Sequence, residues 1–227
     1  ELDEFIDDLH QKQDDFFNAE HPREKKQKRD AVETAIYNIF HSELDKKKNI
    51  SPQEAKEIET DLKEMTHGNK ERNFFPWKLY FADVFREKGG FDVVIANPPY
   101  GVKFTKSEKT LFNEIFKHQN YQLDSYLLFL EKAFSITINE GSIAYIIPNT
   151  WLTNLKLTNI RKLVVHNSKI LTISHYKPKI FEATVDTEVV ILAKSKPVDH
   201  VTNIRIYEKS DTFVVNNIPQ KKWQQLD

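Results

Sequence analysis

The sequence predicts an α/β protein with a helical N-terminal extension. From Phe74 onward, short β-like runs alternate with helical ones, which is typical of parallel strands joined by crossover helices. Before Phe74, apolar residues recur at helical spacing in a highly charged background. We therefore expect a helical arm over residues 1–73 and a larger α/β part over residues 74–227.

The N-terminal extension is predicted to be helical throughout most of its length. One apolar stripe runs from Leu2 to Phe16, and a second runs from Val32 to Leu44. Residues 51–54, Ser-Pro-Gln-Glu, form a capping box with proline at the first helical position, and Gly68 can end the helix that follows. We interpret the stripes as packing contacts of a helical arm or hairpin.

The second part is predicted to hold six strands and three helices. Gly89-Gly90 and Gly141 mark joins between these elements. The expected strands cover residues 78–82, 91–96, 142–147, 170–175 and 188–193, and the expected helices cover residues 107–117, 125–139 and 155–166. One more strand is expected from Asn203, and the sequence after Pro219 is too polar to assign.

Composition indicates an ordinary soluble protein, cytoplasmic by default. The 227 residues are 39% hydrophobic with a formal net charge of -1, and no apolar run is long enough to span a bilayer. There is no cysteine, which excludes disulfides and thiolate metal sites, and we expect no metal. Residues 142–181 contain no Asp or Glu but several Lys and Arg. This stretch is either a phosphate-contacting face or a strand region that is simply poor in acids.

The segment Asn97-Pro98-Pro99-Tyr100 follows the hydrophobic strand 91–96 directly. Two prolines remove two backbone donors and fix φ, so the chain leaves the strand as a rigid extended segment with bare carbonyl groups. Asn97 adds a side-chain acceptor, Pro98 a main-chain acceptor and Tyr100 a flat aromatic face. Such a site suits a planar ring that carries an amino group. The plain alternative is a strand-to-loop exit, where Pro and Asn are common.

This tetrapeptide after a strand resembles the catalytic motif of S-adenosylmethionine-dependent amino-methyltransferases, chiefly the adenine-specific (N6) DNA methyltransferases. The resemblance implies a partial Rossmann-like methyltransferase sheet, S-adenosylmethionine as methyl donor and double-stranded DNA as substrate. It also implies that Asn97 and Pro98 hold the two hydrogens of an extruded adenine's amino group, which frees the nitrogen lone pair for attack. In motif order the chain is most similar to the methylase region of type II restriction-modification enzymes.

The same resemblance implies roles for two residues outside the tetrapeptide. Asp83, expected at the end of strand 78–82, resembles the acidic residue that accepts a hydrogen bond from the cofactor's adenine; its ordinary role would be a cap. Phe181, in the loop before strand 188–193, resembles the aromatic that stacks on the flipped base opposite Tyr100; its ordinary role would be packing. The expected site comprises catalytic Asn97, Pro98, Pro99 and Tyr100, base-binding Tyr100 and Phe181, and cofactor-binding Asp83 and Asn97.

The glycine-rich cofactor loop of such enzymes is missing from the sequence. The five glycines form no Gly-X-Gly turn, which close approach to a cofactor generally needs, and the chain begins at Glu1 without methionine. We therefore interpret the chain as a fragment that is inactive alone and binds S-adenosylmethionine weakly. Its partners would be DNA and the rest of its own polypeptide, including a target-recognition domain; the presence of a nuclease is left open.

A fragment of this kind would leave strand 91–96 with one unpaired edge. Such edges recruit other strands, so we expect the edge to pair with another copy or segment, or to be covered by the N-terminal helices. Two other functions stay open. A protein-glutamine methyltransferase of the release-factor-modifying type accounts equally well for residues 97–100, and a non-catalytic DNA-binding or assembly fragment accounts for the missing glycine loop.

Overall fold

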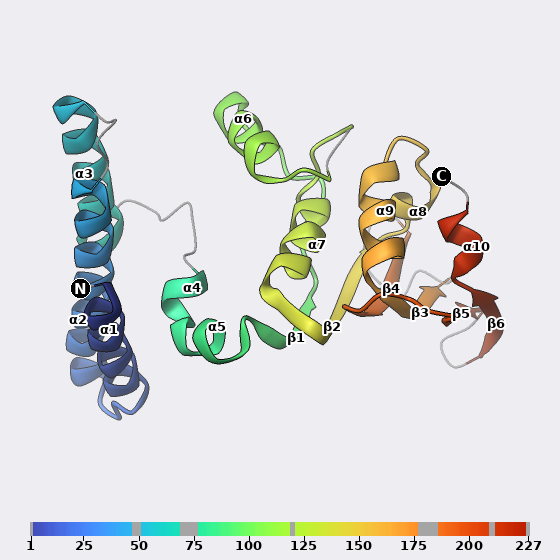
Figure 1. Ribbon diagram of the computed structural model, residues 1–227, viewed down its shortest axis with the longest axis horizontal. Coiled ribbons are helices and arrows are strands. Elements are labelled where there is room, and N and C mark those ends of the chain that lie inside the picture. The colour runs from blue at the N-terminus through green and yellow to red at the C-terminus, as the bar shows by residue number, and fades with distance from the viewer. Residues whose placement is uncertain are drawn as a thin grey trace. The chain divides into compact units, whose positions relative to one another are not determined.

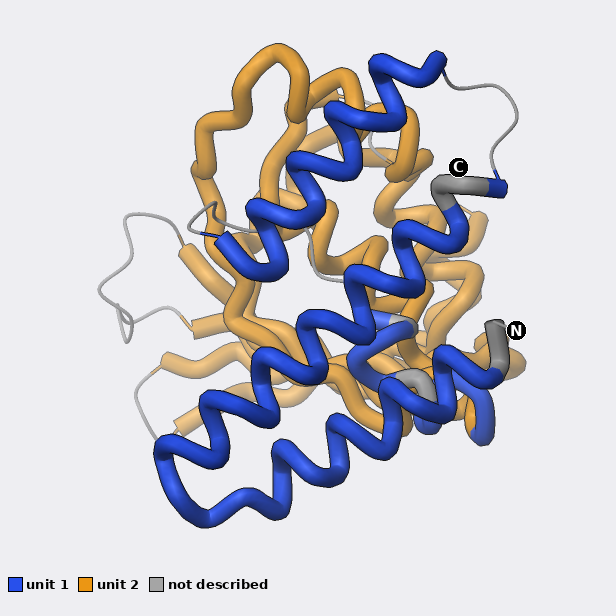
Figure 2. Tube along the Cα trace, turned by 90° about the vertical axis from the view of Figure 1, so that its left-hand side faces the viewer, with its two compact units in different colours: residues 1–87 blue, residues 88–227 orange. Residues whose placement is uncertain are grey.

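A computed structural model of the chain shows two compact units, residues 1–87 and 88–227 (Figure 2). The residues that the structure describes are 2–46, 51–68, 77–118, 121–176, 186–208 and 212–225. No helix within these ranges has the length and apolar character needed to cross a membrane. The expected division of roles between residues 1–73 and 74–227 stays a prediction, since compactness alone assigns no function.

The first unit is helical, as predicted for the N-terminal extension. It contains α1 (Leu2–Phe17), α2 (Pro22–Asp45) and α3 (Pro52–His67), followed by the short α4 (Trp77–Tyr80) and α5 (Ala82–Lys88). Apolar residues at helical spacing form its core, because the apolar stripe of α1 faces that of α2. The buried members are Leu9, Val32, Ala35, Ile36 and Ile39.

The predicted capping box of α3 is confirmed. The Ser51 side chain accepts a hydrogen bond from the backbone N–H of Glu54, and the Glu54 carboxylate accepts one from the backbone N–H of Ser51. Gly68 ends the helix by donating its backbone N–H to the Glu64 carbonyl. These bonds satisfy donors and acceptors that a helix end leaves unpaired.

The predicted strand 78–82 is wrong, because this segment is helical. Backbone N–H groups of Phe81 and Phe85 donate to the carbonyl groups four residues earlier, at 2.9 and 3.0 Å. A short apolar run is equally compatible with a strand or a helix. Here Leu79 and Tyr80 pack against the α1–α2 core, and this packing accompanies the helical conformation.

The second unit is built on one six-stranded sheet in the order β1-β2-β4-β3-β5-β6 (Figure 1). The predicted α/β class, a partial Rossmann-like sheet with a helical N-terminal extension, is confirmed. The strands are β1 (Phe91–Ala96), β2 (Thr137–Pro148), β3 (Lys169–Tyr176), β4 (Thr187–Ala193), β5 (Val201–Tyr207) and β6 (Phe213–Pro219).

The sheet is mixed, which corrects the expectation of purely parallel strands. β1 runs parallel to β2, and β3 runs parallel to β5. β4 is antiparallel to both of its neighbours, and β6 is antiparallel to β5. The stretches of sequence between β3 and β4 and between β5 and β6 are shorter than a parallel crossover needs, so these neighbours pair antiparallel.

The main core lies on one face of this sheet. Alternate residues of the central strands, such as Ile143 and Ile147 on β2 and Val190 on β4, are almost fully buried there. Helices α7 (Ser125–Ile136), α8 (Thr150–Thr153) and α9 (Thr158–Asn167) supply the other half of this core (Figure 1). Of the remaining helices, α6 (Lys106–Ile115) buries no residue, and α10 (Lys221–Gln224) follows β6.

Candidate active site

The candidate site lies at one edge of the sheet, where two parallel strands end. Residues 97–100 follow β1, and Asn149 follows β2, its parallel neighbour. Parallel strands end at the same edge, so the two loops leave the sheet side by side. In open α/β sheets this is the edge at which ligands bind.

Within the predicted tetrapeptide, the four side chains differ in exposure. Asn97 is exposed, Pro98 is buried, Pro99 is exposed, and Tyr100 is half-buried against the main core. Among the described residues, no hydrogen-bond partner of the Asn97 side chain is found. Asn97 therefore presents an amide to solvent from a backbone that two prolines and a packed tyrosine hold in place.

The start of α7 fixes the loop that carries this tetrapeptide. The Ser125 hydroxyl donates to the Pro99 carbonyl at 2.6 Å, and Asp124 Oδ1 accepts the backbone N–H of Gly101 at 3.1 Å. Gly101 has φ +70°, a conformation that favours glycine. The Pro99 carbonyl thus already accepts a hydrogen bond from within the protein.

Asp124 and Ser125 were not among the predicted site residues. The available signal was the pair Asp-Ser directly before an apolar helix, which reads only as a helix cap. In the structure the Asp124 side chain makes no capping bond to its own helix. It binds the backbone of the loop that follows β1 instead, a long-range contact that local sequence does not encode.

A further hydrogen bond joins α7 to α8, the short helix that follows β2. The Tyr126 hydroxyl lies 3.0 Å from the Thr150 hydroxyl, next to Asn149. Burial raises the pKa of Tyr126 to about 12, although the hydrogen bond to Thr150 partly opposes this. The phenol therefore stays neutral and acts as a structural link between α7 and α8.

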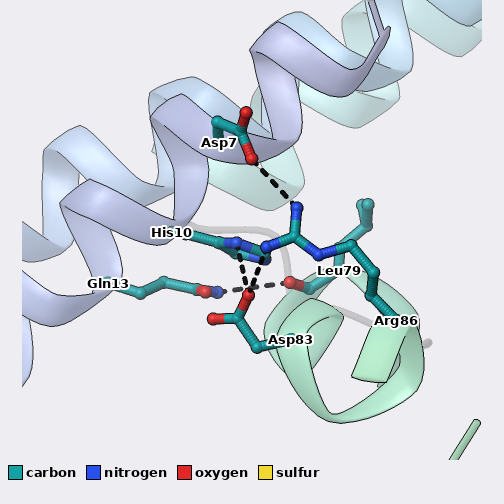
Figure 3. Close-up of polar contacts among 6 residues, drawn as sticks. All are labelled: Asp7, His10, Gln13, Leu79, Asp83 and Arg86. Carbon is teal, nitrogen blue, oxygen red and sulfur yellow. Dashed lines mark hydrogen bonds and ion pairs between the residues drawn. The ribbon is translucent and has the colours of Figure 1, made fainter. Parts of the chain in front are cut away.

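Asp83 lies in α5 rather than at a strand end, so the reason for predicting it there is wrong. Its Oδ1 contacts His10 Nδ1 at 2.8 Å and Arg86 Nη2 at 3.1 Å (Figure 3). Arg86 also reaches Asp7 at 3.0 Å, and Gln13 donates to the Leu79 carbonyl at 3.3 Å. Asp83 belongs to the first compact unit, whereas residues 97–100 belong to the second. Its cofactor role stays a prediction.

Phe181, the predicted second aromatic of the base site, lies outside the described residues. The sandwich with Tyr100 therefore also stays a prediction. Within the described ranges, no group of three or more His, Asp or Glu side chains could hold a metal ion.

The second unit also contains a cavity of about 640 Å³ that none of residues 97–101 lines. Its wall includes Trp151, Trp223 and Glu188. The Glu188 carboxyl is almost fully buried and accepts a hydrogen bond from Trp151 Nε1 at 2.6 Å. Burial raises the pKa of Glu188 to about 7, against a smaller lowering by this bond. No motif in the sequence indicated this cavity.

Comparison with known proteins identifies relatives of this chain. A Methanocaldococcus jannaschii protein bears the name "Putative type II restriction enzyme and methyltransferase RM.MjaORFECS2P". It is 27% identical to this chain over 171 residues, which are 74% of this chain and 14% of that protein. The Escherichia coli type II restriction enzyme and methyltransferase RM.Eco57I is 27% identical over 130 residues, which are 53% of this chain and 12% of that protein. The chain thus spans a small part of the length of both relatives.

Among solved structures, the type IIG restriction endonuclease BpuSI superposes with a TM-score of 0.48 at 18% identity, over 59% of this chain and 19% of that one. The sequence model of the Eco57I restriction-modification methylases matches residues 12–181, well over half of the 227 residues. The chain therefore belongs to the Eco57I restriction-modification methylase family.

Proposed function

We propose that this chain carries the target-base half of an adenine-specific DNA methyltransferase that uses S-adenosylmethionine. The observation that carries the proposal is the exposed Asn97 amide on a rigid loop at the carboxyl edge of the sheet. Family membership supports methyl transfer in restriction and modification. The adenine amino group as target is what the resemblance of residues 97–100 to the adenine-specific DNA methyltransferases implies, and the family match fits it.

The loop suits an amino group attached to an aromatic ring. The Asn97 side-chain oxygen and the Pro98 carbonyl each accept one of the two amino hydrogens. Held in this way, the nitrogen moves towards a tetrahedral shape and its lone pair becomes available to attack. When bound, S-adenosylmethionine would supply an electrophilic methyl group, whose bond to sulfur would break as the bond to nitrogen forms and leave S-adenosylhomocysteine. The nitrogen would then lose a proton to solvent. Tyr100 offers a ring face on which the extruded base can stack.

The chain supplies only part of a cofactor site. The Asp83 carboxylate is held through Oδ1 by His10 and Arg86, which leaves Oδ2 as an acceptor for an amino group. Asn97 is the second expected contact. The sequence has no Gly-X-Gly turn to approach the cofactor closely, so we expect residues 1–227 alone to bind S-adenosylmethionine weakly.

The test is Asn97→Ala in the full-length protein that contains this chain. We expect N6-methyladenine formation on DNA, followed by mass spectrometry of nucleosides, to fall by about 10²-fold or more, as for loss of one preorganised polar contact. Asn167→Ala is the matched control, since Asn167 is an exposed asparagine at the end of α9, near the opposite edge of the sheet.

Wild-type methylation rates in Asn97→Ala would exclude the proposed role. Methyl groups that appear on protein glutamine rather than on DNA, with the same dependence on Asn97, would exclude adenine as the target while keeping the chemistry of the loop.

A further inference from the structure

The loop between α8 and α9 presents one apolar side chain to solvent at its tip. The Leu155 side chain is 86% exposed, the highest value among the large hydrophobic residues of the described ranges. A single exposed leucine is ordinary on a protein surface. What distinguishes Leu155 is how its backbone is held, which charges surround it and which edge of the sheet it occupies.

The backbone around Leu155 is rigidly supported. The Arg161 guanidinium donates to the carbonyl groups of Trp151 at 2.9 Å and Asn154 at 2.5 Å, with a longer contact to Leu155 at 3.4 Å. The Lys156 backbone N–H donates to Asn154 Oδ1 at 2.9 Å. On either side, Trp151 and Leu157 are buried in the core. The backbone on both sides of Leu155 is therefore held in place, while the Leu155 side chain projects into solvent.

The surroundings of Leu155 favour a negatively charged partner. The Lys156 ammonium lies 4.3 Å from the centre of the exposed Tyr121 ring, which comes from the loop before α7. The stretch of sequence from residue 142 to residue 181 contains no Asp or Glu. Together these features combine an apolar tip, a cation and an aromatic ring, without a carboxylate in the same stretch of chain.

The loop lies at the same edge of the sheet as Asn97. β2 ends at this edge, and α9 leads from it back to the start of β3 at the other edge. The beginning of α7, which holds the Pro99 carbonyl through Ser125, is also here. In Figure 1 the loop between α8 and α9 and the beginning of α7 lie on the same, upper side.

We propose that Leu155 is a wedge that enters the DNA base stack where the target base leaves it, with Lys156 on an adjacent phosphate. The inference rests on the proposed function, because it names the contact by which this edge holds duplex DNA. An extruded base leaves a gap in the duplex, and an apolar side chain on a stiff backbone fills such gaps. Leu155 acts on the base stack and not on the reacting atoms, so it is a positioning residue.

The test uses two 30-base-pair DNA duplexes of the same sequence, one intact and one with a central abasic site. Fluorescence anisotropy measures the affinity of the wild-type chain for each duplex. An abasic gap accepts the wedge without unstacking, so we expect binding about tenfold tighter than to the intact duplex. In Leu155→Ala this preference disappears, and in Leu155→Met it returns. Lys156→Ala keeps the preference and lowers the dependence of log affinity on log salt by about one.

Val198→Ala is the matched control. Val198 is 78% exposed and lies in the loop between β4 and β5, at the opposite edge, so the preference should remain. Methylation by Asn97→Ala is a separate measurement, which separates this inference from the catalytic proposal. If Asn97 proves irrelevant to methylation while Leu155→Ala still loses the preference, the catalytic proposal fails and the role of Leu155 in the base stack is retained. Equal binding of both duplexes by the wild-type chain, or an unchanged preference in Leu155→Ala, overturns it.

Discussion

At the scale of single residues, the tetrapeptide depends on neighbours that it does not contain. Ser125 is buried and donates to the Pro99 carbonyl from the first turn of α7. Asp124 accepts the Gly101 backbone N–H from the same place. In the proposed site the tetrapeptide would supply the acceptors, while the start of α7 holds the backbone of the loop that carries them.

Ser125→Ala should therefore impair catalysis more than stability. Loss of the hydroxyl leaves a carbonyl unpaired, which we expect to cost about 1–2 kcal/mol of unfolding free energy. Displacement of the loop should lower the methylation rate by about tenfold or more, since catalysis is sensitive to small misplacements. Ser135→Ala, which removes an exposed hydroxyl bonded to Lys132 on the same helix, is the control. An unchanged rate in Ser125→Ala would contradict this view of the loop.

Glu188 makes the stability of the second unit depend on pH. Its pKa is raised from 4.5 to about 7 by burial, so the folded state holds the proton more tightly than the unfolded state does. The stability that this group contributes is full below pH 4.5 and is lost as the pH rises to about 7. The whole loss amounts to about 3 kcal/mol at most.

Glu188→Gln should remove this pH dependence. Glutamine keeps an oxygen that can accept the Trp151 N–H, but it does not titrate. Urea unfolding of both proteins at about pH 5 and about pH 7.5 should show a fall in wild-type stability that the variant lacks. Parallel pH curves for the two proteins would mean that Glu188 ionises at its ordinary pKa.

At the scale of elements, α6 depends on its cap because it buries no residue. The Thr105 hydroxyl accepts the Glu108 backbone N–H, and the Glu108 carboxylate accepts the Thr105 backbone N–H at 2.7 Å. Thr105→Ala should cost about 1 kcal/mol and speed amide hydrogen exchange at residues 106–109 by about fivefold. Thr105→Ser should stay near the wild-type rate, and Ser51→Ala should speed exchange in α3 instead. Unchanged exchange in Thr105→Ala would show that packing holds α6.

Elements with strong local patterns could be predicted from the sequence. β1 matches its prediction, β3 and β4 match within one residue at each end, and both α3 and its cap were expected. The site loop was likewise visible, because two prolines after a strand constrain the backbone locally.

What could not be predicted depends on contacts between distant segments. α4 and α5 replace an expected strand, and α8 is a short helix that was not expected. The helix expected over residues 155–166 is present as α9, but it begins three residues later. One residue of the polar C-terminal segment has a structural role that was not expected. Gln220 is fully buried, accepts the Ile170 backbone N–H and donates to the carbonyl groups of Val165 and Ser168. No local pattern marks a glutamine for such a role.

At the scale of the whole molecule, β1 is an edge strand of the sheet that the described residues form, pairing with β2 on one side. Its Val93 and Ile95 side chains, on the face away from the main core, are 55% and 75% exposed. An apolar strand with an unpaired edge is a site for association with another strand. The resemblance to methyltransferases predicted that β1 would have an unpaired edge, and the pairing or covering of this edge stays a prediction.

We expect the isolated chain to self-associate through β1 as its concentration rises, which sedimentation velocity can follow. Ile95→Lys should weaken this association, since a charge on an edge strand opposes pairing with a second copy. Val198→Lys adds the same charge at an equally exposed apolar residue, which lies in the loop between β4 and β5 and not on β1. This variant should leave the association unchanged. Hydrogen exchange at the β1 amides should slow with concentration in the wild-type chain and in Val198→Lys, but not in Ile95→Lys. A chain that stays monomeric throughout, with concentration-independent exchange in β1, would show that this edge is not a pairing surface.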